Sequence, residues 1–188
     1  MLRKAKALGK SNHRGACTGL VPLGQLEAAA AFDPAAMDPA QVREVILEEH
    51  RKIRVLLARL ESDAMTLLAC SVPKPAARRA LRLQALALCD ELTAHIAFEN
   101  RVLVPLVEII DAWGPVRAQT LLEEHEAQLQ LLGAYADMLM VDTETNQDTS
   151  LTVWQLVRSI GQDMREEEKQ VLSAEFLSDR VGQNVETG

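Results

Sequence analysis

The segment TAHIAFENRVLVP, residues 93–105, places His95 and Glu99 four residues apart inside a run that is otherwise mostly apolar. Residues four apart lie one above the other on an α-helix, so both side chains share a stripe with Leu92 and Val102. An apolar stripe normally faces a core. An imidazole and a carboxylate on that stripe therefore need a buried partner.

The composition around this segment is typical of one all-α domain. Of the 188 residues 48% are apolar but only 3% are aromatic, and Leu, Ala and Glu, which favour helix, are abundant. The length is that of a single domain. The formal charge of −7 disfavours nucleic-acid binding, which normally needs a basic surface.

The cysteines and the apolar segments indicate a soluble cytoplasmic protein. Three cysteines form no CxxC pair and are odd in number, so the sequence predicts no disulfide framework. The basic start MLRKAKALGK is not followed by the continuous apolar segment of a secretory signal. No apolar stretch approaches the roughly 20 residues of a membrane span.

Turn signals divide the chain into an arm at residues 1–37, a helical domain at residues 38–173 and a tail with one short helix at residues 174–188. The first helix is expected from Pro39, with Asp38 as N-cap, to about residue 70. The second is expected at about 76–104, because Pro105 ends or kinks a helix.

A third helix is predicted at about 115–141, and a fourth, capped by Thr149 or Ser150, up to about residue 172. Four long helices joined by short connections predict an up-down-up-down antiparallel bundle.

The other helices repeat the pattern of His95 and Glu99. LEEH occurs at 47–50 and again at 122–125, while HIAFE at 95–99 corresponds to DMREE at 163–167. Helical spacing turns one set of polar side chains towards the core, namely His50, His95, Glu99, His125, Asp163 and Glu167. The neighbouring acidic residues are interpreted as surface charge: Glu48, Glu49, Glu123, Glu124, Glu166 and Glu168.

The inward-facing set predicts a metal site. Buried carboxylates cost several kcal/mol each if they stay ionised and unpaired, and Arg54 is the only basic side chain placed to pair with them. Imidazole nitrogens and carboxylate oxygens on facing helices suit iron, manganese or zinc.

These motifs resemble the hemerythrin-like (HHE cation-binding) family, which places H…HxxxE…H…HxxxE on four successive helices around a non-haem diiron centre. The resemblance covers about residues 39–173. His50, His95 with Glu99, and His125 match the pattern, whereas Asp163 stands where the family has its fourth metal-binding histidine. The additional histidine of oxygen-carrying hemerythrins would fall at Leu129 and is absent.

The resemblance implies a role for each matching residue. His50 and His95 would bind one iron ion, His125, with or without Asp163, would bind the other, and Glu99 and Glu167 would bridge the two. Asp163 would bind directly, orient a water or accept a hydrogen bond from a ligand.

Three functions remain open from the sequence. The first is a diiron protein that binds or senses dioxygen, nitric oxide, iron or redox state. The second is a diiron enzyme acting on peroxide, nitric oxide or ferrous iron. The third is a structural or partner-binding bundle whose metal site has degenerated.

Overall fold

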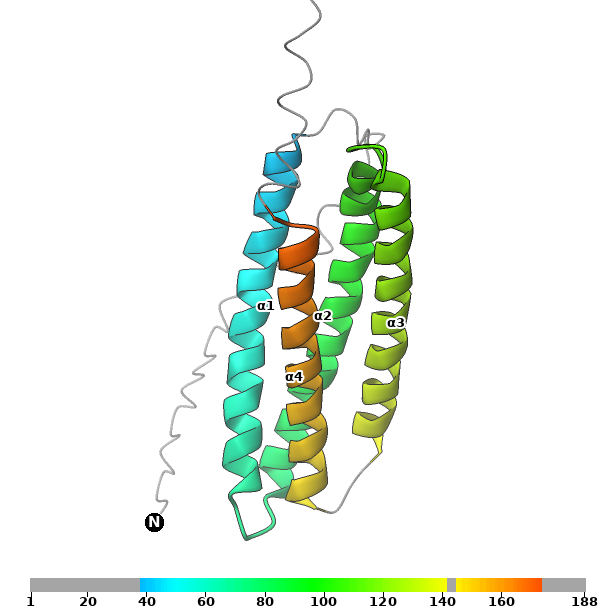
Figure 1. Ribbon diagram of the computed structural model, residues 1–188. Coiled ribbons are helices and arrows are strands. Elements are labelled where there is room, and N and C mark those ends of the chain that lie inside the picture. Colours follow the sequence, from blue (N-terminus) through cyan, green and yellow to red (C-terminus); the bar gives the residue numbers. More distant parts are fainter. Residues whose placement is uncertain (1–37, 142–144, 174–188) are drawn as a thin grey trace, which may run out of the picture.

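The computed structural model describes residues 38–141 and 145–173, and within these ranges it contains four helices and no strand. They are α1 (Pro39–Leu68), α2 (Pro75–Glu108), α3 (Gly114–Met140) and α4 (Asn146–Gln170), and neighbours in sequence run antiparallel (Figure 1). The predicted all-α up-down-up-down bundle is confirmed. The predicted arm at 1–37 and tail at 174–188 lie outside the described residues.

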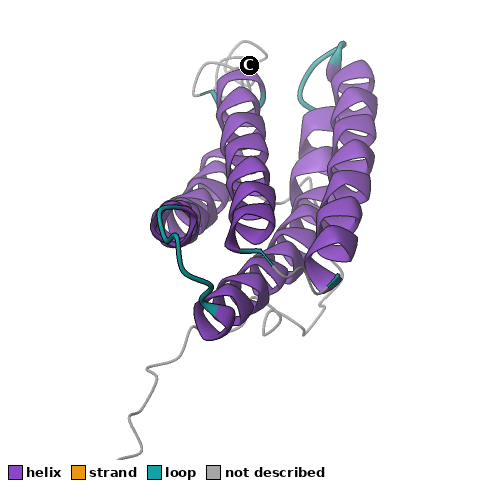
Figure 2. Ribbon diagram, turned by 90° about the horizontal axis from the view of Figure 1, so that it is seen from below, coloured by secondary structure: helices purple, strands orange, loops and turns teal. Residues whose placement is uncertain are grey.

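The helices form two pairs. α1 packs mainly against α4 and α2 mainly against α3, as the two views show (Figures 1 and 2). Of the three pairs of helices that follow one another in the sequence, α3 and α4 pack least closely. None of the described helices has an apolar stretch long enough to cross a membrane.

Side-chain caps fix the starts of α1 and α4. Asp38 Oδ1 accepts from the Ala40 amide at 3.0 Å, with Pro39 at the first helical position, as predicted. Thr145 Oγ1 accepts from the Asp148 amide at 3.1 Å, so α4 starts one turn earlier than predicted. The expectation that Thr149 or Ser150 caps this helix is wrong, because both are buried inside α4.

Pro105 does not end α2, which continues to Glu108. The proline removes one backbone hydrogen bond and costs about 3 kcal/mol inside a helix. Leu103, Leu106 and Val107 are fully buried around it, and each such side chain contributes roughly 1.5–3 kcal/mol. Burial of this turn therefore outweighs the proline.

The core consists of two apolar clusters with a polar layer between them. The larger cluster, which includes Leu60, Leu88 and Leu156, fills the end of the bundle near the α1–α2 connection. The smaller one, which includes Ile46 and Leu103, fills the opposite end. The inward-facing histidines and carboxylates lie between the two.

Candidate metal centre

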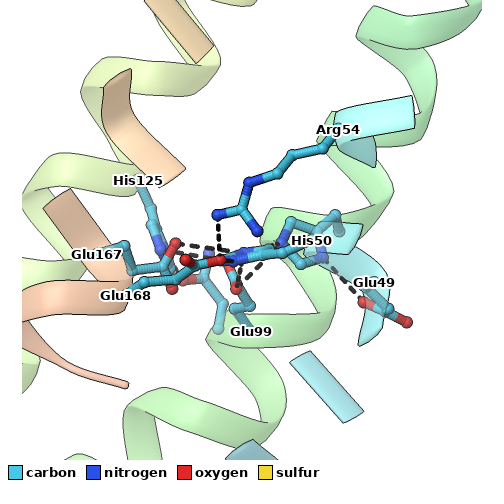
Figure 3. A network of polar contacts seen from close by, with 9 residues as sticks. Glu49, His50, Arg54, Glu99, His125, Glu167 and Glu168 are labelled. Carbon is cyan, nitrogen blue, oxygen red and sulfur yellow. Dashed lines mark hydrogen bonds and ion pairs between the residues drawn. The ribbon is translucent and has the colours of Figure 1, made fainter. Parts of the chain in front are cut away.

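Five predicted residues meet in the polar layer, with at least one from every helix. His50 comes from α1, His95 and Glu99 from α2, His125 from α3 and Glu167 from α4. Every one of these side chains is at most 10% exposed. The side chains of His50, Glu99, His125 and Glu167 point towards one centre (Figure 3).

The first group of ligand atoms consists of His50 Nε2, His95 Nε2 and Glu99 Oε1. The two nitrogens are 3.0 Å apart, and the Glu99 oxygen lies 3.1 Å from His95 and 3.6 Å from His50. Ligands about 2.1 Å from one metal ion are about 3.0 Å apart at a right angle and about 3.4 Å apart at a tetrahedral angle. The three atoms therefore fit around a first-row metal ion.

The second group consists of Glu99, His125 and Glu167. Glu99 Oε2 lies 3.5 Å from His125 Nε2, so the two oxygens of Glu99 face different groups. Glu167 Oε2 lies 3.6 Å from His50 Nε2 and thus also reaches towards the first group. Carboxylates in such positions can bridge two cations.

Carboxylates hold the outer nitrogens of the first two histidines. His50 Nδ1 lies 2.8 Å from Glu168 Oε1, and His95 Nδ1 lies 2.8 Å from Glu49 Oε2. A carboxylate oxygen accepts, so both Nδ1 atoms donate. The inner Nε2 atoms are then the nitrogens available to a metal, an arrangement that raises the basicity of metal-binding imidazoles.

His125 has a neutral partner instead. Its Nδ1 donates to Asn100 Oδ1 at 2.6 Å, which also leaves Nε2 pointing to the centre. All three imidazoles therefore present the same nitrogen, and one of the three lacks an anionic support.

Several inner atoms have no hydrogen-bond partner among the described residues, although they are buried: Glu99 Oε1, His125 Nε2 and Glu167 Oε1. Glu99 Oε1 lies near His95 but outside hydrogen-bond geometry. Unsatisfied buried acceptors cost free energy, and a shared cation would satisfy them together. The donor set thus fits the metal site predicted from the sequence.

Without a cation, protons must balance the charge. Burial alone would lower the pKa of His95, but the hydrogen bond with Glu49 and the adjacent carboxylate of Glu99 raise it to about 10. Burial opposes ionisation of Glu99 too, yet contacts with His50 and His95 lower its pKa. Burial and the nearby Glu99 charge raise the pKa of Glu167 well above its ordinary value. Both shifts favour the protonated forms of His95 and Glu167, which reduces the negative charge of the cluster.

Arg54 partly neutralises the negative charge of Glu168 at the outer edge of the polar layer. Its Nη2 lies 2.5 Å from Glu168 Oε1, the same oxygen that accepts from His50. Burial would raise the pKa of Glu168, but hydrogen bonds from Arg54 and His50 lower it. The predicted pairing of Arg54 with the carboxylates is therefore made through Glu168 and not through Glu99 or Glu167.

Asp163, the sixth predicted ligand, belongs to neither group of ligand atoms. It is half-buried and lines a cavity of about 270 Å³ between α3 and α4, together with His125 and Glu167. Burial raises the pKa of Asp163, and the charges of Glu166 and Glu124 raise it further.

The interpretation of Glu49 and Glu168 as surface charge is wrong, and Asn100 was not singled out at all. Each of the three is the sequence neighbour of an inner ligand, yet supports a histidine on another helix. Helical spacing turns adjacent residues about 100° apart, so the stripe that identified the ligands excludes their neighbours. Only the packing of the helices decides which neighbours reach a ring.

Comparison with known proteins supports the same conclusion. The model of the hemerythrin HHE cation-binding domain matches residues 41–174, which span all four helices. No curated protein and no solved structure gave a match. Five of the six predicted residues lie in the two His/Glu groups that could hold metal ions, and Asp163 lies in neither. The chain belongs to the hemerythrin HHE cation-binding domain family.

Proposed function

We propose that the protein holds a non-haem diiron centre that binds or senses a small ligand, such as dioxygen or nitric oxide, or reports iron or redox state. His50 and His95 would hold one ion and His125 the other, with the carboxylates of Glu99 and Glu167 between them. Iron supplies redox chemistry and a position for a diatomic ligand.

The observation that carries this proposal is the convergence of three imidazole Nε2 atoms on one bridging carboxylate. His50 Nε2 and His95 Nε2 are only 3.0 Å apart while their outer nitrogens are both bound by carboxylates. Two lone pairs at this distance repel unless a cation or a proton lies between them. Glu99 then directs its second oxygen to His125, which extends the site to a second ion.

The residues of the chain also control what reaches the centre. The cavity between α3 and α4 ends at His125 and Glu167, and its volume of about 270 Å³ admits a diatomic molecule. The two apolar clusters close the bundle above and below the polar layer and exclude bulk water from those directions. Ligand access is therefore expected from the α3–α4 side.

The test is metal analysis of protein purified without oxygen, together with absorbance spectra before and after exposure to air. We expect about two iron ions per chain and new charge-transfer bands after oxidation. His95→Ala serves as the comparison, because it removes one ligand and leaves the rest of the bundle intact. Manganese or zinc in place of iron would refute the diiron assignment, and protein without any metal would support a degenerate bundle.

A diiron redox enzyme is the second candidate, and the carboxylates around His125 favour it. Glu99, Glu167 and Asp163 lie on this side of the centre, and carboxylate ligands favour the ferric state. Iron-loaded protein mixed with peroxide or nitric oxide separates the two functions. Repeated consumption indicates catalysis, whereas one equivalent bound per centre indicates binding or sensing.

A further inference from the structure

The cavity between α3 and α4 carries a series of carboxylates from the surface to the metal centre. Glu124 of α3 and Glu166 of α4 are exposed on its outer part, Asp163 is half-buried, and Glu167 and His125 lie deepest. The solvent exposure of these acidic side chains therefore falls from the surface towards the metal centre. The series ends at His125 Nε2 and Glu167 Oε1, two buried atoms without hydrogen-bond partners among the described residues.

This cavity adjoins a second one of about 20 Å³ that reaches the first group of ligand atoms. The smaller cavity is lined by His95 and Glu99 and shares Gln128, Asp163 and Glu167 with the larger one. Gln128, Asp163 and Glu167 therefore lie between the surface cavity and the small cavity beside Glu99.

The outer carboxylates carry uncompensated charge. Among the described residues no basic side chain forms an ion pair with Glu124, Asp163 or Glu166. Glu124 and Glu166 act on Asp163 as like charges. A groove lined by one sign of charge concentrates ions of the opposite sign.

The opposite side of the centre has the reverse character. There the Arg54 guanidinium covers Glu168, and Glu168 in turn binds the outer nitrogen of His50 (Figure 3). A cation that approaches from α1 meets a positive charge. A cation that approaches between α3 and α4 meets the carboxylates of Glu124, Glu166 and Asp163.

We propose that the α3–α4 cavity is the entry route of the metal cation, where Glu124 and Glu166 attract the ion and Asp163 passes it to His125 and Glu167. This inference rests on the proposed metal centre but concerns how the centre is filled. It also explains why a carboxylate is useful at position 163. An anionic side chain outside both ligand groups binds an incoming cation without holding it in the final site.

The first experiment follows Co²⁺ uptake by metal-free protein in a stopped-flow spectrometer, with the visible absorbance of the bound ion as the signal. Glu124→Gln combined with Glu166→Gln should slow uptake about tenfold, as expected for loss of electrostatic attraction. The Co²⁺ bound per chain at saturating concentration should stay the same. Glu123→Gln combined with Glu126→Gln is the matched control, because these exposed residues of α3 lie outside the cavity and the charge change is identical.

A second variant tests the route itself. Ala127 lines the cavity and is exposed, so Ala127→Trp obstructs the path without changing charge. A blocked path should slow Co²⁺ uptake and Co²⁺ release into excess chelator by the same factor, while the dissociation constant stays constant. Loss of attraction alone would slow uptake more than release.

Two results would overturn the entry route. The first is equal uptake by the Glu124/Glu166 variant and its control, together with unchanged rates in Ala127→Trp. The second is a lower number of Co²⁺ ions per chain in the Glu124/Glu166 variant at saturating Co²⁺, which would make these residues ligands. Failure of wild-type protein to bind Co²⁺ more tightly than His95→Ala is a different result, because it would refute the metal centre and the route with it.

Discussion

The two halves of the polar layer differ in how they support their histidines. In the α1–α2 half, Glu168 and Glu49 bind the outer nitrogens of His50 and His95. In the α3–α4 half, His125 has only the amide of Asn100. The first half is enclosed between the helices, whereas the second opens into the cavity that Asp163 lines.

This difference indicates that the two halves of the site have different roles. Anionic partners make the imidazoles of the first half stronger ligands and fix their orientation. Among the described residues, the second half has acceptor atoms without hydrogen-bond partners, but it is reachable from solvent. We therefore expect the first half to dominate metal affinity and the second half to dominate exchange and reactivity.

Removal of metal from both halves should have the largest effect. Binding to the folded state stabilises it by about 4 kcal/mol when free metal exceeds the dissociation constant a thousandfold. For a bundle of this size, the melting temperature should fall by roughly 10–20 °C after chelation. Calorimetry of metal-free and reloaded protein measures the change. Equal melting temperatures would contradict a buried ligand cluster.

Substitution of a ligand in the first half should weaken metal binding more than substitution of Asp163 does. His95→Ala removes one of the two closest nitrogens and should weaken metal binding by about 100-fold or more. Asp163→Ala should leave the bound metal nearly unchanged, because Asp163 belongs to neither ligand group. Metal content after dialysis against a weak chelator compares the two. Equal losses would make Asp163 a full ligand.

Exchanging the charged and neutral partners of the histidine Nδ1 atoms should make the metal affinities of the two halves more similar. Glu49→Gln gives His95 a neutral partner. It should lower the affinity for the ion at His50 and His95 about tenfold, which is within the range for residues that hydrogen-bond to metal ligands. Asn100→Asp gives His125 an anionic partner and should raise the affinity for the ion at His125. Competition titrations with a chelator measure both dissociation constants.

Glu48→Gln is the control for this exchange, because Glu48 is exposed and pairs only with Arg51 among the described residues. Its effect should be within the small range of surface ion pairs. A similar loss in Glu48→Gln and Glu49→Gln would mean that general charge, and not the bond to His95, decides affinity.

The last expected effect is a pH dependence of metal affinity. His95 holds a proton below pH about 10 in the metal-free protein, whereas burial lowers the pKa of His125. A metal ion must displace the His95 proton, and Glu167, whose pKa is also raised, contributes another. Affinity should therefore rise with pH and fall as the pH falls. Titration calorimetry in two buffers of different ionisation enthalpy should detect proton release on metal binding. Binding without proton release would contradict this charge balance.

The sequence predicted the bundle and the inward-facing histidines and carboxylates because both depend on helical periodicity. Apolar residues three and four apart define the core face, and His95 and Glu99 share that spacing. The family pattern depends on the same spacing, which is why the motifs and the helices agree. Helix ends were predicted less well, since Pro105 and Thr145 depend on burial and capping in the folded chain.

The tertiary structure alone decided how the ligands are supported and reached. Glu49, Asn100 and Glu168 lie one residue from inner ligands, and only the register between helices brings them to histidines of other helices. The same register leaves the α3–α4 side open and places Asp163 in its wall. Periodicity within one helix identifies which residues face the core, but contacts between helices depend on relative rotation and height, which no single segment encodes.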